Sequence, residues 1–182
     1  MPSAIGTGSY EYPISAVLGI RGSGKTLLLT AIAHNADAIG YNVFTNFTLY
    51  GIPHTKVKGK EIEEKASMIK DGVLLLDEMR EVSDSYDPFA ATPKQVATFA
   101  AQSRKRRITI FYAAQDLMQV AVRVRRLTDI VIEMYSTDEP GYHEYRIMTK
   151  DLPNELIKDY TLFYGKPFYN MYDTNEIISE DD

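Results

Sequence analysis

The sequence predicts an α/β fold in which a mainly parallel β-sheet carries helices on both faces. Three observations support this prediction. Apolar stretches of strand length alternate with helix-forming segments along most of the chain. A glycine-rich octapeptide, residues 19–26, joins the first apolar stretch to a helix-forming one. A later apolar stretch, residues 73–76, ends directly in two acids. Parallel sheets of this kind are buried on both faces and bind ligands at the carboxyl ends of their strands.

The expected elements follow from these patterns, with Gly40 placed to cap the first helix and Thr92-Pro93 placed to begin the third. Residues 137–141 predict a turn from which the last strand returns antiparallel. The final thirty or so residues are rich in Tyr and Phe, and we expect them to wrap back over the core. The sequence predicts strands at 14–20, 42–47, 73–76, 108–113, 130–134 and 142–148, and helices at 25–39, 60–70, 92–106 and 117–124.

The composition limits the classes of function. A chain of 182 residues suits a single domain, with a main core over about 14–135 and a C-terminal hairpin and an aromatic and acidic tail over 136–182. The net charge of −5 means that any nucleic-acid contact needs a local basic patch. The absence of cysteine excludes disulfides, thiolate zinc sites and thiol nucleophiles. The three histidines lack metal-ligand spacing.

The sequence shows no sign of membrane insertion. No apolar run approaches the ~20 residues that span a bilayer, and residues 1–13 lack the basic start and apolar run of a signal peptide. We therefore expect a soluble, cytoplasmic protein.

The octapeptide matches G-x-x-x-x-G-K-[ST] at every fixed position and has the strand–loop–helix context that this motif requires. Its glycines allow backbone angles that a Cβ would forbid, so that its amides can cradle phosphate oxygens at a helix N-terminus. We expect Lys25 to reach the β- and γ-phosphates and the Thr26 hydroxyl to ligate Mg²⁺. The expected phosphate-binding residues are Gly19, Arg21, Gly22, Ser23, Gly24, Lys25 and Thr26.

The acids Asp77 and Glu78 close the buried run Val73–Leu76. Asp77 is suited to hold Mg²⁺ through its water shell, because this ion dehydrates reluctantly. Glu78 is suited to orient and deprotonate an attacking water. Solvated acids also end many strands that have no catalytic role, but the phosphate-loop motif upstream favours the functional interpretation.

Gln115 follows the buried run 108–114. If this strand lies between the strand before the phosphate loop and the strand before Asp77, Gln115 faces the γ-phosphate and can sense it. The alternative is an ordinary turn residue.

Arginines gather in two clusters, residues 104–107 and 123–126. Three interpretations stay open. Basic residues at a helix C-terminus complement the helix dipole. They can line a DNA groove. One of them can be an arginine finger, which stabilises charge on the γ-phosphate and often comes from a neighbouring subunit.

The set formed by residues 19–26, Asp77-Glu78, Arg104 and Gln115 resembles the FtsK–HerA superfamily of P-loop ATPases. Viral genome-packaging ATPases and Zot-like phage assembly ATPases look most similar. The resemblance covers about residues 14–135. The pair Thr45-Asn46 is similar to a step at the end of strand two in the Zot-like group, and the segment from Arg104 to Gln115 resembles the family's unit of arginine, apolar strand and glutamine.

The resemblance implies a RecA-like fold of the additional-strand, catalytic-glutamate type. It implies that ATP and Mg²⁺ are the cofactors, with Lys25 and Thr26 on phosphate and metal, Asp77 completing the metal site, Glu78 as base, Gln115 as sensor and Arg104 as candidate finger. It further implies a homo-oligomeric ring, favouring a hexamer, that moves double-stranded DNA, with a capsid or portal-vertex protein as a further partner. Zot-like proteins usually carry a transmembrane helix and another domain, which this sequence does not show, so the resemblance favours DNA packaging over virion extrusion.

Two other classes of function remain as alternatives. A P-loop kinase could use Arg123, Arg125 and Arg126 as lid arginines, although Glu78 beside Asp77 favours water activation. A nucleotide-dependent scaffold could bind a partner through the aromatic tail, Phe163, Tyr164, Phe168, Tyr169 and Tyr172. A GTPase is disfavoured because neither N-K-x-D nor T-K-x-D occurs.

Overall fold

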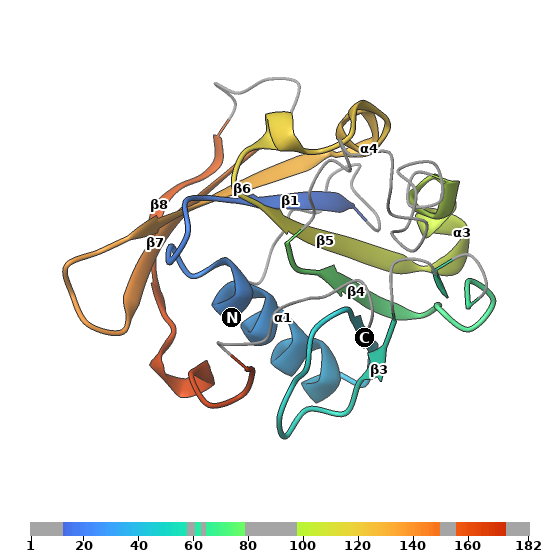
Figure 1. The fold of residues 1–182 in the computed structure, drawn as a ribbon, viewed down its shortest axis with the longest axis horizontal. Coiled ribbons are helices and arrows are strands. Elements are labelled where there is room, and N and C mark those ends of the chain that lie inside the picture. Colours follow the sequence, from blue (N-terminus) through green and yellow to red (C-terminus); the bar gives the residue numbers. More distant parts are fainter. Residues whose placement is uncertain (1–12, 58–60, 63–64, 79–97, 150–155, 174–182) are drawn as a thin grey trace, which may run out of the picture.

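A single eight-stranded sheet organises the computed structural model, which describes residues 13–57, 61–62, 65–78, 98–149 and 156–173 (Figure 1). The strands lie in the order β3-β2-β4-β5-β1-β6-β7-β8. Their bounds are β1 Ile14–Leu18, β2 Asn42–Thr45, β3 Thr55–Lys56, β4 Gly72–Leu76, β5 Ile108–Ala114, β6 Ile130–Ser136, β7 Tyr142–Thr149 and β8 Leu156–Tyr164. The helices are α1 Lys25–Ala38, α3 Ser103–Arg106 and α4 Val122–Leu127, with short 3₁₀ turns η2 Leu117–Gln119 and η3 Lys166–Phe168.

The first six strands of this order, β3 to β6, are parallel, which confirms the predicted sheet. β5 lies between β4 and β1, with Leu76 opposite Tyr112 and Leu18 opposite Ala114. The segments that follow β1, β4 and β5 therefore leave the sheet at the same edge. These are the phosphate loop, the acid pair and Gln115.

Helices cover both faces of the sheet, as predicted. On one face, α1 packs through Leu29 and Ala33 against a cluster that includes Val17, Leu75 and Phe111. On the other, residues 98–100 and α4 pack against alternate strand residues such as Ala16 and Leu74. Figure 1 shows α1 on one side of the sheet and α3 and α4 on the other. Strand residues of β1 and β4 are thus buried on both sides, which accounts for their continuous apolar runs.

The C-terminal part extends the sheet with two antiparallel strands. β7 pairs with β6, which confirms the predicted hairpin, and β8 then adds an edge strand that the sequence analysis did not predict. Beyond β8 the chain crosses back over α1, and Tyr172 forms an isolated bridge with Leu49. The tail therefore wraps over the core in part: Phe163 and Tyr172 pack against it, whereas Tyr164 and Tyr169 are exposed.

The prediction of a charged helix at 60–70 was wrong for the residues that the structure describes there. Positions 65–68 form a turn. Ile62 and Ile69 are both buried in the core cluster on the face of the sheet that residues 98–100 and α4 cover. A segment this short gains little from helix formation by itself, so the burial of these two side chains decides its path.

Two further predicted helices are divided in the structure. In the described part of 92–106, residues 98–100 are helical, a turn follows at 101–102, and α3 then ends at Arg106, the predicted end, before Arg107, whose φ is 54°. The predicted start at Thr92 and Pro93 lies outside the described residues. The helix predicted at 117–124 is instead η2 and then α4, because the Asp116 carboxylate caps the amide of Met118 and closes a separate short turn.

Strands β1 and β2 end two residues earlier than predicted, at Leu18 and Thr45. Gly19 turns the chain out of the sheet with a φ of 153°. None of the helices within the described ranges combines the length and the apolar character that crossing a bilayer requires.

Two strands approach each other very closely at Gly72, the first residue of β4. A Cβ at this position would overlap with the main-chain carbonyl of Asn42 on β2. We expect Gly72→Ala to lower the free energy of unfolding by at least about 2 kcal/mol, because backbone atoms on both strands must move apart. Urea denaturation measures this change.

Gly51→Ala is the matched control. Gly51 has a φ of 73° but open space at its Cβ position, so its substitution carries only the backbone strain of about 1–2 kcal/mol. Equal losses in the two variants would contradict the close approach of β2 and β4.

Candidate nucleotide site

The octapeptide forms a loop between the end of β1 and the start of α1. Gly22 and Gly24 have φ values of 83° and 93°, and no side chain caps the first turn of α1. The first amides of a helix have no partner within it, so this turn presents unpaired N–H groups and a positive helix end to the loop. Ser23 is fully buried, and its hydroxyl has no hydrogen-bond partner among the described residues.

Lys25 curls back over the loop. Its Nζ donates to the carbonyls of Gly19 at 2.8 Å and Ile20 at 2.9 Å. Burial lowers the pKa of Lys25, and the Asp77 carboxylate acts in the opposite direction. The ammonium group therefore lies at the mouth of the loop, on weak carbonyl partners that an anion could replace. Arg21, by contrast, is exposed on the loop.

Thr26 and Asp77 meet directly although they lie on different elements. The Thr26 hydroxyl, in the first turn of α1, donates to Asp77 Oδ2 at 2.7 Å. Asp77 directly follows β4. The structure thus brings together the two residues that the sequence predicted as metal ligands.

Asn46 holds Asp77 through the main chain, which the sequence analysis did not anticipate. Its side chain accepts from the Asp77 amide at 2.7 Å and donates to the Asp77 carbonyl at 2.9 Å. Asn46 itself follows β2 and donates its amide to Leu75 O, so it is fixed to the neighbouring strand. The available signal was the Thr45-Asn46 pair at a strand end.

Glu78 is exposed beside Asp77 in a left-handed backbone conformation, with a φ of 54°. Its amide donates to Asp77 Oδ1 at 2.9 Å. A positive φ is uncommon for a residue with a Cβ, and here it turns the chain sharply after β4. The carboxylate of Glu78 is therefore presented at the same edge as the phosphate loop.

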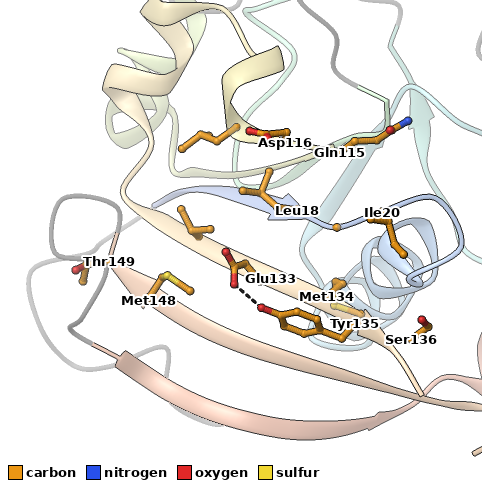
Figure 2. Close-up of a pocket in the computed structure, with 13 residues that line it drawn as sticks. Leu18, Ile20, Gln115, Asp116, Glu133, Met134, Tyr135, Ser136, Met148 and Thr149 are labelled. Atoms are coloured by element: carbon orange, nitrogen blue, oxygen red, sulfur yellow. Dashed lines mark hydrogen bonds between the residues drawn. The ribbon is translucent and has the colours of Figure 1, made fainter. Parts of the chain in front are cut away.

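Gln115 is exposed just past β5, between the ends of β4 and β1. The strand order on which its predicted role depended is thus confirmed. Gln115 and Asp116 border a cavity of about 540 Å³ that also reaches Gly19 and Ile20 of the loop. Figure 2 shows the side chains of Glu133 and Tyr135 on β6 that line the opposite wall of this cavity.

Polar side chains of β6 and β7 hold that wall in place. Glu133 accepts from the Tyr135 hydroxyl at 2.6 Å and from Arg146 Nε at 2.6 Å. Burial, followed by the hydrogen bond to Glu133, raises the pKa of Tyr135. The Arg146 guanidinium also lies 5.5 Å from the ring centre of Tyr160. The negative charge of Glu133 is thus neutralised beside the cavity.

The arginine cluster on α3 lies away from the loop. α3 precedes β5 and Gln115 follows it, so the seven residues of β5 separate them by roughly 20 Å at a strand rise of ~3.3 Å per residue. Arg106 is bound to Ala66 O and Gln102, and Arg107 is paired with Asp71. Arg104 is exposed, and its side chain makes no hydrogen bond or ion pair with another described residue. The structure does not bring it to the loop of its own chain.

These positions suit a bound Mg–nucleotide. The first turn of α1 offers amides without a helical partner, and the loop offers a buried unsatisfied hydroxyl and the Lys25 ammonium group. Together they match the charge and hydrogen-bonding capacity of phosphate. Thr26 and Asp77 offer oxygen ligands of the kind that Mg²⁺ prefers. In the part of the chain that the structure describes, no group of three or more His, Asp or Glu residues forms a larger metal site.

The fold and the octapeptide together define the P-loop NTPase class of α/β proteins. No protein-family model matches the chain, and no curated protein matches it. Solved structures do match. The N-terminal domain of zonular occludens toxin from Neisseria meningitidis superposes with a TM-score of 0.62 at 17% identity, covering 90% of this chain and 100% of that one.

A second group of similar structures is viral. The genome-packaging NTPase of Sulfolobus turreted icosahedral virus 2, in complex with ATP-gammaS, has a TM-score of 0.57 at 10% identity and covers 85% of this chain and 98% of its own. The DNA-packaging ATPase of Sulfolobus turreted icosahedral virus has a TM-score of 0.55 at 12% identity, covering 83% and 97%. At these identities the similarity establishes the fold.

The bidentate contact between Asn46 and Asp77 yields a prediction. Asn46→Ala removes both hydrogen bonds and leaves an amide and a carbonyl of a partly buried residue unpaired. We expect the free energy of unfolding to fall by about 1–3 kcal/mol, as measured by thermal or urea unfolding.

Asn42→Ala serves as the control, because the Asn42 side chain makes a single exposed hydrogen bond to Lys70 O at 3.0 Å. Its substitution should cost less than about 1 kcal/mol. If the two asparagines proved equally important, Asn46 would not anchor Asp77.

Proposed function

We propose that this protein hydrolyses ATP and is the motor subunit of an assembly that moves double-stranded DNA. The hydrogen bond between Thr26 and Asp77 carries the part of this proposal that concerns ATP hydrolysis. It joins the hydroxyl of a phosphate-loop motif to a carboxylate at the end of a buried neighbouring strand, with a second carboxylate, Glu78, directly after it.

The proposed roles follow from placement. The loop residues Gly19–Thr26 bind the phosphates, and Lys25 exchanges its two carbonyl partners for phosphate oxygens, which accept hydrogen bonds more strongly because they are charged. Glu78, exposed at the same edge, accepts a proton from the attacking water. Gln115, which lies between the ends of β4 and β1, senses the γ-phosphate.

The Thr26 hydroxyl and the Asp77 carboxylate would hold Mg²⁺. When bound, the ion neutralises charge that develops on the phosphates. Asn46 keeps Asp77 in position through its main chain and does not bind its carboxylate.

We further propose that the chain acts as one domain and assembles into a homo-oligomeric ring, with a hexamer favoured. In a head-to-tail contact, the end of one subunit that carries α3 can meet the phosphate-loop end of the next, and such contacts form a ring when the rotation between subunits closes. Arg104 is the favoured finger because Arg106 and Arg107 are held by contacts within their own chain. The likeness to two viral packaging ATPases supports genome packaging in a host cytoplasm, with a capsid or portal-vertex protein as a further partner.

A second candidate is a virion assembly ATPase of the Zot-like type. The higher TM-score and the complete coverage of the zonular occludens toxin domain favour it. Both candidates share the ATP site and differ in the substrate that moves.

The first test is Mg-dependent ATP turnover, measured with and without duplex DNA, together with the particle mass in solution. We expect phosphate release from ATP alone, stimulation by duplex DNA and a mass of several subunits. Glu78→Gln should bind ATP with wild-type affinity and turn over about 10²- to 10⁴-fold more slowly, because the amide cannot accept the water proton.

Turnover in Glu78→Gln equal to the wild type would remove the assigned base. Phosphate transfer only when a second acceptor is supplied would instead indicate a kinase. Turnover that duplex DNA leaves unchanged would count against a DNA motor.

The arginine finger has its own test. Arg104→Ala should lower turnover by at least about 100-fold, whereas Lys105→Ala on the same exposed helix should not. Mixing Arg104→Ala with Lys25→Ala should restore part of the activity, because one variant supplies the arginine and the other an intact loop. If activity does not return on mixing, a finger from the neighbouring subunit is contradicted.

A further inference from the structure

A histidine from the C-terminal hairpin lies against the phosphate loop. His143 is on β7, where it pairs with Ser136 of β6 and Phe163 of β8. A Cβ placed on Gly24 would be 2.7 Å from His143 Nδ1 and 2.9 Å from its Cε1. The imidazole ring therefore lies against the glycine that caps α1, at a helix end that no side chain caps.

The nitrogen nearest to the loop has no partner. His143 Nδ1 is buried and makes no hydrogen bond with any residue that the structure describes. Almost all buried polar atoms in proteins are hydrogen-bonded, so an exception calls for an explanation. Here the surroundings supply one, because the adjacent helix end favours an anion whose oxygens could accept from an N–H group.

The ring is held from the other side. Gly165 packs against Leu27 of α1 and against His143 Cδ2, and Phe163 lies 6.4 Å from the imidazole centre. A phenylalanine or leucine would fill this space without leaving a buried nitrogen unsatisfied. The packing therefore explains where the ring lies, but it does not explain why position 143 holds a histidine and not an apolar residue.

We propose that His143 is a nucleotide-binding residue, and that its Nδ1–H donates to a phosphate oxygen of the nucleotide bound in the loop. This proposal rests on the proposed function, since it assumes the same phosphate site. It extends that site beyond the loop and the strand ends to the C-terminal hairpin. β7 then closes the site from the side opposite Asp77.

The test compares substitutions that separate donation from packing. Asn places its amide nitrogen near the position of Nδ1, Gln near that of Nε2, and Leu fills the space without a donor. Calorimetric titration of the full chain with ADP and Mg²⁺ should show binding weakened by about 10- to 100-fold in His143→Leu, the range for a hydrogen bond to a charged group. His143→Asn should recover most of the affinity and His143→Gln less.

His34→Leu is the control. His34 contacts Phe168 edge-on at 5.6 Å in the same row of rings but lies on α1 away from the loop, so its substitution should leave ADP affinity unchanged. Thermal unfolding of each variant shows whether it is folded. Should the Leu variant fail to fold, the comparison of Asn with Gln still decides.

The outcomes separate the two proposals. ADP binding in His143→Leu that equals or exceeds the wild type overturns the role of His143 and leaves the proposed function standing. The role of His143 is likewise overturned if Asn is no better than Leu or Gln. Absence of ADP binding by the folded wild type overturns both.

Discussion

The geometry of the whole site depends on the way Asp77 is held. Asn46 fixes its main chain from the end of β2, and the Thr26 hydroxyl binds its carboxylate from the start of α1. The contact to Thr26 is charge-assisted and roughly twice as strong as a neutral one. The end of β2, the end of β4 and the start of α1, which are distant in sequence, are thus held together at Asp77. These contacts require β4 to lie beside β2, so the position of Asp77 depends on the order of the strands.

Local patterns in the sequence were sufficient for the parts of the fold that burial dictates. The apolar run Val73–Leu76 is buried on both faces, and the octapeptide gives the loop. The role of Asn46 could not be predicted from the sequence, because it depends on which strand is next to β2. The helix prediction for 60–70 failed for the same reason, since contacts with the distant core fix Ile62 and Ile69. The strand β8 could have been predicted from the sequence, because Tyr160, Leu162 and Tyr164 recur at every second position, which is the period of a strand. In the structure all three are exposed.

The proposed function needs a γ-phosphate sensor and an arginine finger, and the candidates for these two roles lie at opposite ends of β5. Gln115 follows the strand at the phosphate edge, and the basic residues of α3 precede it at the other edge. Arg106 and Arg107 are used there to tie α3 to the turn at 65–71. A rigid strand of seven residues cannot bend the two ends together. An arginine of α3 that acts on the phosphates must therefore come from a second molecule, and the polarity of a parallel sheet makes that contact head-to-tail.

The C-terminal segment gives the sheet a second connection to the site. After β8 the chain packs Gly165 against Leu27 and then reaches Tyr172, which bridges to Leu49. Burial raises the pKa of Tyr172, and the Asp77 carboxylate adds to the rise. The segment thus contacts the first turn of α1 at one end and lies in the field of Asp77 at the other. The segment that follows β8 therefore connects the outer strands β7 and β8 to the helix that begins at the phosphate loop.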